Sequence, residues 1–314
     1  MNEEQSTTIS VLDPLTPAFE RVKTVLFRPF DLGRWFTIGF CAWLACLVAG
    51  GGGGGGGPRW QSHPRDVGQG FHQAKEFILD NVYWIVPVAV MGVILVIAVH
   101  LLLTWLSSRG RFMFLHCVAE DKAEVKIPWT KFRKHANSLF LFRIVVGIVG
   151  FLLAVIFSLI VLFVALSMKA ALGFNVFTII GAILSALLFI VLAIVFALIQ
   201  KFTMDFVVPV MFLRTTSCVT AWREFLALLS ANKARFTLYV LFQIAIAIAI
   251  GAIVLAAALV TCCCAACILA IPYIGTVLML PVLVFKRAYS LYYFQQFGPQ
   301  FDVFGLETEP GGLG

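Results

Sequence analysis

The sequence contains little charge. Only 12% of its 314 residues are charged and 61% are hydrophobic, whereas soluble domains are about 25% charged and about 45–50% apolar. This scarcity excludes an ordinary soluble domain and predicts an integral membrane protein. The net charge of +7 forms no separate basic domain, because the basic residues flank apolar runs. We therefore expect membrane lipids as partners and no nucleic acid.

Motifs for catalysis and metal binding are also missing. The five histidines are dispersed, and the chain has no HExxH, GxSxG or paired-carboxylate pattern. No Asp, Glu, Lys or Arg lies in the middle of a predicted span, which counts against proton- or sodium-coupled transport. We expect no enzyme activity, no cofactor and no metal, and an intramembrane enzyme is the least favoured alternative.

The eight cysteines do not form a disulfide framework, because half of them are scattered and the others lie in one short cluster. The cluster consists of Cys262, Cys263, Cys264 and Cys267. Its CxxC spacing matches a redox motif or half of a metal site, but no histidine and no second pair accompany it. We prefer small residues at a helical turn, with thiol chemistry or metal binding as alternatives.

Long apolar runs dominate the chain. They predict an all-α membrane protein of six transmembrane helices in three hairpins, at about residues 35–48, 83–106, 139–166, 174–199, 236–260 and 268–285. The first run is short for a bilayer that needs about 20 apolar residues. The polar lead before it is too long for a signal peptide.

One membrane domain, residues 13–290, holds all six predicted spans. We expect a disordered tail at residues 1–12, a glycine-rich extracytoplasmic loop at 50–81 and a cytoplasmic tail at 291–314. The loop lacks the Lys-Ser/Thr ending of a phosphate-binding loop, so its eight consecutive glycines indicate a spacer.

An amphipathic segment precedes each hairpin. Three aromatic residues mark these segments, and each precedes by a similar spacing an arginine that opens an apolar run: Phe19 and Arg34, Trp129 and Arg143, Trp222 and Arg235. In the third segment the apolar residues fall at i, i+3, i+4 and i+7, which gives a helix one apolar stripe. These are Trp222, Phe225, Leu226 and Leu229.

We expect this stripe at headgroup depth, where nearby basic residues contact anionic lipid or partner proteins. The candidate contact residues are Arg214, Trp222, Arg223, Lys233 and Arg235. The alternative is that the helix packs on the ends of the bundle and only stabilises it, because an amphipathic stripe also buries well on protein.

The distribution of basic residues predicts the topology. Nineteen of the 23 lysines and arginines lie in the N-terminal segment, the tail and alternate loops. The positive-inside rule then places both termini and all three amphipathic helices in the cytoplasm. The expected location is the inner (cytoplasmic) membrane of the cell.

Small residues and prolines indicate packing between spans. Gly150, Ala154 and Ser158 lie four apart and favour close contact between the third and fourth spans, and the alanine-rich fifth span is expected to have several neighbours. Pro272 and Gly275 interrupt the sixth span. Broken helices line binding sites in transporters, although simple kinks are commoner.

Three stretches resemble a known group. They are LTPAFERVKTVLFRPFDLGRWFTIGF (15–40), DFVVPVMFLRTTSCVTAWREFLALL (205–229) and IPYIGTVLMLPVLVFKRAYSLYYFQQFGP (271–299). They resemble bacterial six-span integral membrane proteins of unknown function, related to the membrane domain attached to some glycerophosphodiester phosphodiesterases. The resemblance implies six spans. No catalytic domain follows the sixth span, so we do not expect the phosphodiesterase reaction.

The leading functional hypothesis is a non-enzymatic membrane scaffold or accessory that contacts lipid headgroups or partner proteins through its cytoplasmic helices. The alternative is a permease for a lipid or an apolar small solute. A continuous polar cavity between the spans would favour the permease, and a filled core would favour the scaffold.

Overall fold

A computed structural model describes residues 9–48, 81–170, 176–261, 268–269 and 271–305, and every regular element within them is a helix. This confirms the all-α prediction for the described residues. The α-helices are α1 (Leu15–Phe27), α2 (Leu32–Cys46), α4 (Val82–Ala119), α5 (Lys126–Lys131), α6 (Arg133–Ala170), α7 (Val176–Phe202), α8 (Val208–Arg214), α9 (Cys218–Ala231), α10 (Lys233–Val260), α12 (Pro272–Leu278) and α13 (Leu280–Gln295). A π-helix, η1 (Thr203–Val207), joins α7 to α8, and a short 3-10 helix, η2 (Pro299–Phe301), follows α13.

Four helical segments are long and apolar enough to cross a membrane: Tyr83–Ala119, Arg133–Phe163, Ile183–Arg214 and Lys233–Val260. The chain is therefore a multi-pass membrane protein. Helices α12 and α13 pass the same test together but meet at a bend of 62°, which makes a fifth, broken span if they are counted as one. Helix α2 is apolar but has only 15 residues, fewer than the roughly 20 that a straight span needs.

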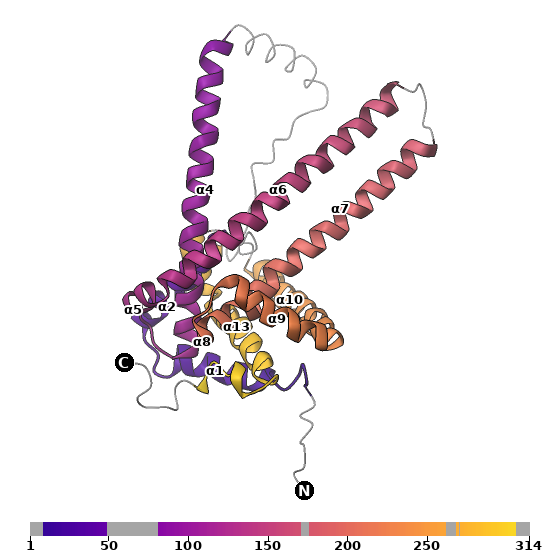
Figure 1. Cartoon of the computed structure of the whole chain (residues 1–314). Coiled ribbons are helices and arrows are strands. Elements are labelled where there is room, and N and C mark those ends of the chain that lie inside the picture. The colour runs from indigo at the N-terminus through magenta and orange to yellow at the C-terminus, as the bar shows by residue number, and fades with distance from the viewer. Residues whose placement is uncertain (1–8, 49–80, 171–175, 262–267, 270, 306–314) are drawn as a thin grey trace.

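The long helices leave one compact end of the molecule, which we call the base, with α4 pointing away from the neighbouring pair α6 and α7 (Figure 1). The base contains α1, α2, α5, α8, α9, α12 and α13 with the adjoining ends of α4, α6, α7 and α10. The free parts of these four helices, residues 83–102, 144–163, 180–197 and 244–260, are called the arms. Arm side chains are mostly exposed, as expected where lipid surrounds an apolar helix.

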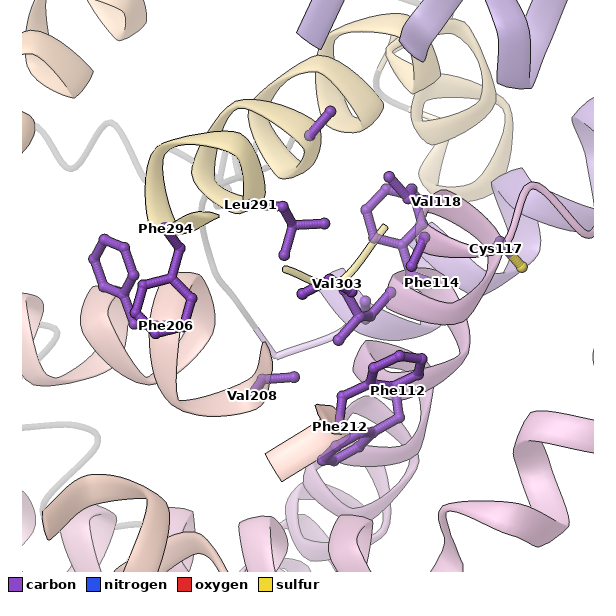
Figure 2. Packing of buried hydrophobic residues seen from close by; sticks show 14 of the residues in the cluster. Phe112, Phe114, Cys117, Val118, Phe206, Val208, Phe212, Leu291, Phe294 and Val303 are labelled. Carbon is purple, nitrogen blue, oxygen red and sulfur yellow. The ribbon is translucent and has the colours of Figure 1, made fainter. Parts of the chain in front are cut away.

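Aromatic side chains fill the base. Phe206 of η1 lies at the centre, with its ring centroid 5.2 Å from that of Phe225, 5.2 Å from Phe236 and 5.3 Å from Phe294. Figure 2 shows Phe206 and Phe294 facing each other across this core. Such ring pairs add to the stability gained from apolar burial, so the core of this membrane protein lies at the ends of its long helices.

Helices α2 and α4 meet backbone to backbone in the base. A Cβ atom on Gly110 would lie 2.5 Å from the backbone nitrogen of Ala45, closer than real contacts allow. The Ser107 hydroxyl donates a hydrogen bond to the Ala45 carbonyl oxygen over 2.9 Å. Glycine is therefore required at position 110 for the two helices to touch.

The arms of α6 and α7 touch, as the small residues of the sequence predict. A Cβ atom on Gly150 would lie 3.2 Å from the Phe196 ring, and Phe157 stacks on Phe189 at 4.5 Å. The prediction of several neighbours for the fifth span is wrong within the described residues. Only 6% of the most apolar stretch of α10 is buried, because only the first turns of this helix enter the base.

Parts of both predicted tails pack against helices of the base. Residues 9–12, assigned to a disordered tail, lie on α13: the Ser10 amide donates to the Gln296 Oε1 over 2.8 Å, and the Tyr289 hydroxyl donates to the Val11 carbonyl. At the other end, Phe301 and Val303 are buried in the base. The hydrogen bonds hold residues 9–12 on α13, and the buried side chains of Phe301 and Val303 hold the C-terminal segment on the base.

Candidate functional site

Helix α9, the third predicted amphipathic helix, begins and ends at clear signals. Thr215 has a left-handed backbone conformation, with φ of 48°, which ends α8. The Ser217 hydroxyl then accepts a hydrogen bond from the Thr220 amide and caps α9. The turn between the two helices sets which face of α9 meets the base.

The stripe of α9 divides between two environments. Phe225 is buried beneath Phe206. Trp222 is half-buried, with its ring 5.8 Å from Phe142 of α6. Leu226 is 49% exposed, and Leu229 is half-buried. Two stripe residues thus stabilise the base, and the other two face a groove.

This groove lies between α7, α9 and α10. Its volume is about 450 Å³, and its lining is Leu198, Phe202, Leu226, Leu229, Ser230, Lys233, Phe236, Thr237, Val240 and Leu241. Lys233 is the one charged residue in that lining. The volume falls within the usual range for small-ligand sites, about 300–1,000 Å³.

The predicted basic contact residues differ in whether they already have a partner within the protein. Arg214 forms an ion pair with Glu224, with its Nη2 2.7 Å from the Glu224 Oε1. Arg235 is exposed and donates to the Asn232 Oδ1 over 3.2 Å. Arg223 and Lys233 are exposed and form no ion pair within the described part of the chain. These two cations are the best placed to meet an external anion.

An apolar trough with one ammonium group suits an amphipathic ligand. The trough accepts a hydrocarbon chain, and Lys233 at its wall attracts a phosphate or carboxylate group. The indole N–H of Trp222 is buried and has no hydrogen-bond partner among the described residues. The groove begins where α7 and α10 leave the base.

The predicted thiol cluster cannot be placed, because Cys262, Cys263, Cys264 and Cys267 lie outside the described residues. Of the other cysteines, Cys218 is buried at the start of α9, and this burial raises the pKa of its thiol to about 12. Its thiol is therefore protonated and unreactive at neutral pH. No group of three or more potential metal ligands occurs within the described ranges.

Sequence reasoning missed most of the polar contacts within the base. Asp205 of η1 accepts hydrogen bonds from Lys201 over 2.8 Å and from the Tyr239 hydroxyl over 2.9 Å. Gln243 donates to the same hydroxyl over 3.2 Å, so its bond stays within α10. Arg143 of α6 donates to the hydroxyls of Ser107 and Ser108 on α4, each over 3.2 Å.

A signal for these groups was present in the sequence. Arg111 and Arg143 lie beside apolar runs, where basic residues look the same in the sequence as loop residues that face the cytoplasm. The structure buries both of them.

The comparisons with known proteins give a family without an activity. The sequence model of a family of unknown function, DUF7544, matches residues 9–280. No curated protein matches the chain, and no solved structure matches it.

Proposed function

Since the chain belongs to DUF7544, a family of unknown function, we propose from its geometry that it is a membrane scaffold whose base binds anionic lipid. The groove between α7, α9 and α10 takes an acyl chain, and Lys233 meets the headgroup. The observation that carries this proposal is the combination of an apolar trough with one unpaired lysine in its lining.

The filled core of the base supports a scaffold. Aromatic rings occupy its centre, and the arms diverge without enclosing a polar path among the described residues. A rigid base beside a membrane presents its surface helices to lipid and to partner proteins. We propose that α1, α5 and α9 form this surface.

We further propose that α2 and the bent α12 and α13 complete six spans, with both termini in the cytoplasm. The short length of α2 requires local thinning of the bilayer or added turns. Reporter tags at residues 1 and 314 should both give cytoplasmic signals, and an extracytoplasmic C-terminus would reject the even number of spans. The relationship to the phosphodiesterase membrane domain likewise stays a prediction.

Lipid binding is tested with Lys233→Glu in the full chain purified in mild detergent. The readout is the affinity for fluorescent phosphatidylglycerol in competition with phosphatidylcholine. Each basic residue near anionic lipid contributes about 1 kcal/mol. A charge reversal removes this attraction and adds a repulsion of similar size, so it should weaken binding roughly thirtyfold. Lys134→Glu makes the same charge change on an exposed part of α6 away from the groove and should leave the affinity within about twofold.

A second variant separates lipid binding from a structural role. Leu226→Trp should fill the groove and lower lipid affinity while thermal stability is kept, because this side chain is exposed. If the combined change of Arg223, Lys233 and Arg235 to Glu leaves lipid affinity unchanged while Trp222→Ala lowers thermal stability, α9 is structural and the proposal is wrong.

A permease for an apolar solute is the second candidate, and one observation favours it. Helices α12 and α13 meet at 62°, beside a cavity of about 250 Å³ that Pro272, Gly275 and Met279 help to line. Broken helices of this kind border transport sites. Uptake of fluorescent lipids into proteoliposomes, faster than into protein-free liposomes, would favour the permease over the scaffold.

A further inference from the structure

Three arginines lie buried together in the base, on helices far apart in the sequence. Arg111 of α4 is 3% exposed, and Arg143 of α6 and Arg287 of α13 are each 8% exposed. Arg143 Nη1 lies 3.2 Å from the Oγ of Ser107, one turn before Arg111 on α4, and α13, which carries Arg287, also packs against α4. Three like charges thus lie buried on helices that pack together.

The cluster lacks a matching set of carboxylates. Arg111 forms no ion pair with a carboxylate among the residues that the structure describes. Asp205 lies within range of Arg287, but it already forms an ion pair with Lys201, at 2.8 Å. The single carboxylate of Asp205 therefore cannot neutralise both Lys201 and the three buried arginines.

The hydrogen-bond donors of Arg111 are unused. Its Nε and Nη1 atoms are buried without a partner, and its guanidinium makes no hydrogen bond to any residue that the structure describes. The Nε of Arg287 is also buried and unpartnered, although its Nη1 donates to the Met204 carbonyl. Buried donors without partners are rare in folded proteins.

Arginine cannot escape this cost by losing its proton. The guanidinium stays protonated in proteins, and an isolated buried charge is strongly unfavourable. A bound anion removes both problems, because it supplies negative charge and acceptor oxygens. The planar guanidinium fork binds oxyanions such as phosphate with paired hydrogen bonds.

We propose that Arg111, Arg143 and Arg287 bind a phosphate group inside the base. Several donors from different helices suit a tetrahedral oxyanion with more than one negative charge. Arg143 is oriented by Ser107 and Ser108, and Arg111 and Arg287 supply the free donors. This site is separate from the α7, α9 and α10 groove and does not rest on the proposed function.

A cavity of about 250 Å³ is lined in part by Lys286, the residue before Arg287 on α13. A phospholipid headgroup or free phosphate supplies the same chemistry, so the test must distinguish these two sources.

The first experiment uses the full wild-type chain, purified in mild detergent without phosphate buffer. Phosphorus is assayed per polypeptide, and native mass spectrometry identifies the adduct. A phospholipid adduct that Arg111→Met loses and Lys233→Glu keeps assigns a lipid headgroup to the arginine site. If the chain carries none, a rise in melting temperature with added inorganic phosphate, absent with chloride at equal ionic strength, assigns free phosphate.

The second experiment compares variants by melting temperature against concentration of phosphatidylglycerol or inorganic phosphate. Arg111→Met keeps an unbranched apolar stem and removes the guanidinium, and it should raise the half-saturating concentration by about tenfold or more, the effect of one charge-assisted hydrogen bond. Arg111→Lys should lose less because it keeps the charge. Lys134→Met, on an exposed part of α6 outside both proposed sites, should match the wild type.

The proposal is overturned if the wild-type chain carries no phosphorus and its melting temperature responds to neither ligand. It is also overturned if Arg111→Met binds both ligands as tightly as the wild type. Lys233→Glu should leave the response to inorganic phosphate unchanged and weaken only the phosphatidylglycerol binding of the groove, so failure of the groove and failure of the arginine site can be told apart.

Discussion

The two halves of α4 are one continuous helix in two different environments. Residues 107–119 are all buried in the base, whereas residues 83–102 are exposed at every position except the half-buried Ile85. The buried half contains Ser107, Arg111 and His116, and the exposed half has His100 as its one ionisable side chain apart from Tyr83. In a soluble protein the apolar half would be buried and the half with polar side chains would be exposed.

This comparison shows what determines burial in the molecule. An apolar arm loses nothing by facing acyl chains, because lipid is as apolar as its own side chains. Polar groups cannot face acyl chains and must find partners inside protein or at the water boundary. Stability should therefore depend on side chains in the base and very little on those in the arms.

The largest expected effect is the loss of Phe206. Phe206→Ala leaves a cavity among Phe225, Phe236 and Phe294 and should lower the free energy of unfolding by about 3–5 kcal/mol. Phe151→Ala is the matched change in the α6 arm, where the side chain is 68% exposed, and should cost less than about 1 kcal/mol. Denaturant unfolding in mild detergent, followed by circular dichroism, measures both. Equal losses would reject the distinction between base and arms.

A smaller contrast is expected between two glycines of α4. Gly110→Ala places a Cβ atom against the α2 backbone and should cost about 1–3 kcal/mol through overpacking. Gly92 has open space around it, so Gly92→Ala should be neutral or stabilise the helix by up to about 1 kcal/mol. Thermal unfolding of both variants in the same detergent tests the sign. A stabilising Gly110→Ala would show that α2 and α4 do not touch.

The smallest effect is expected within the arms. Phe157 stacks on Phe189 with centroids 4.5 Å apart, and Phe157→Leu should cost about 0.5–1.5 kcal/mol, the value of one aromatic pair. A double-mutant cycle with Phe189→Leu measures this coupling. Additive single changes, with no coupling energy, would mean that α6 and α7 separate in the membrane.

The arms could be predicted from the sequence, and the base could not. Continuous apolar runs mark α4, α6, α7 and α10, because few structures other than transmembrane helices contain so many apolar residues in a row. The aromatic residues after these runs, such as Phe206 and Phe225, have the composition of an interfacial belt. Only tertiary contacts distinguish that belt from a packed core.

The candidate site was predicted in part. The stripe of α9 and the exposed cations Arg223 and Lys233 followed from helical spacing. The groove could not be predicted from that spacing, because its other two walls are α7 and α10. Helix α7 is separated from α9 in the sequence, and the lining residues of α10 belong to a continuous apolar run. The charge of Arg111 was visible, but its burial depends on the close contact of α2 at Gly110, which no local pattern encodes.

Photolabelling in liposomes tests the division into arms and base most directly. A phospholipid with a diazirine on its acyl chain is activated by light, and mass spectrometry maps the modified residues. We predict labels on all faces of residues 83–102, on Leu226 in the groove, and none on Phe225 or on residues 107–119. Labelling confined to one face of residues 83–102, with helical period, would show that the arms pack into a bundle and would contradict the account.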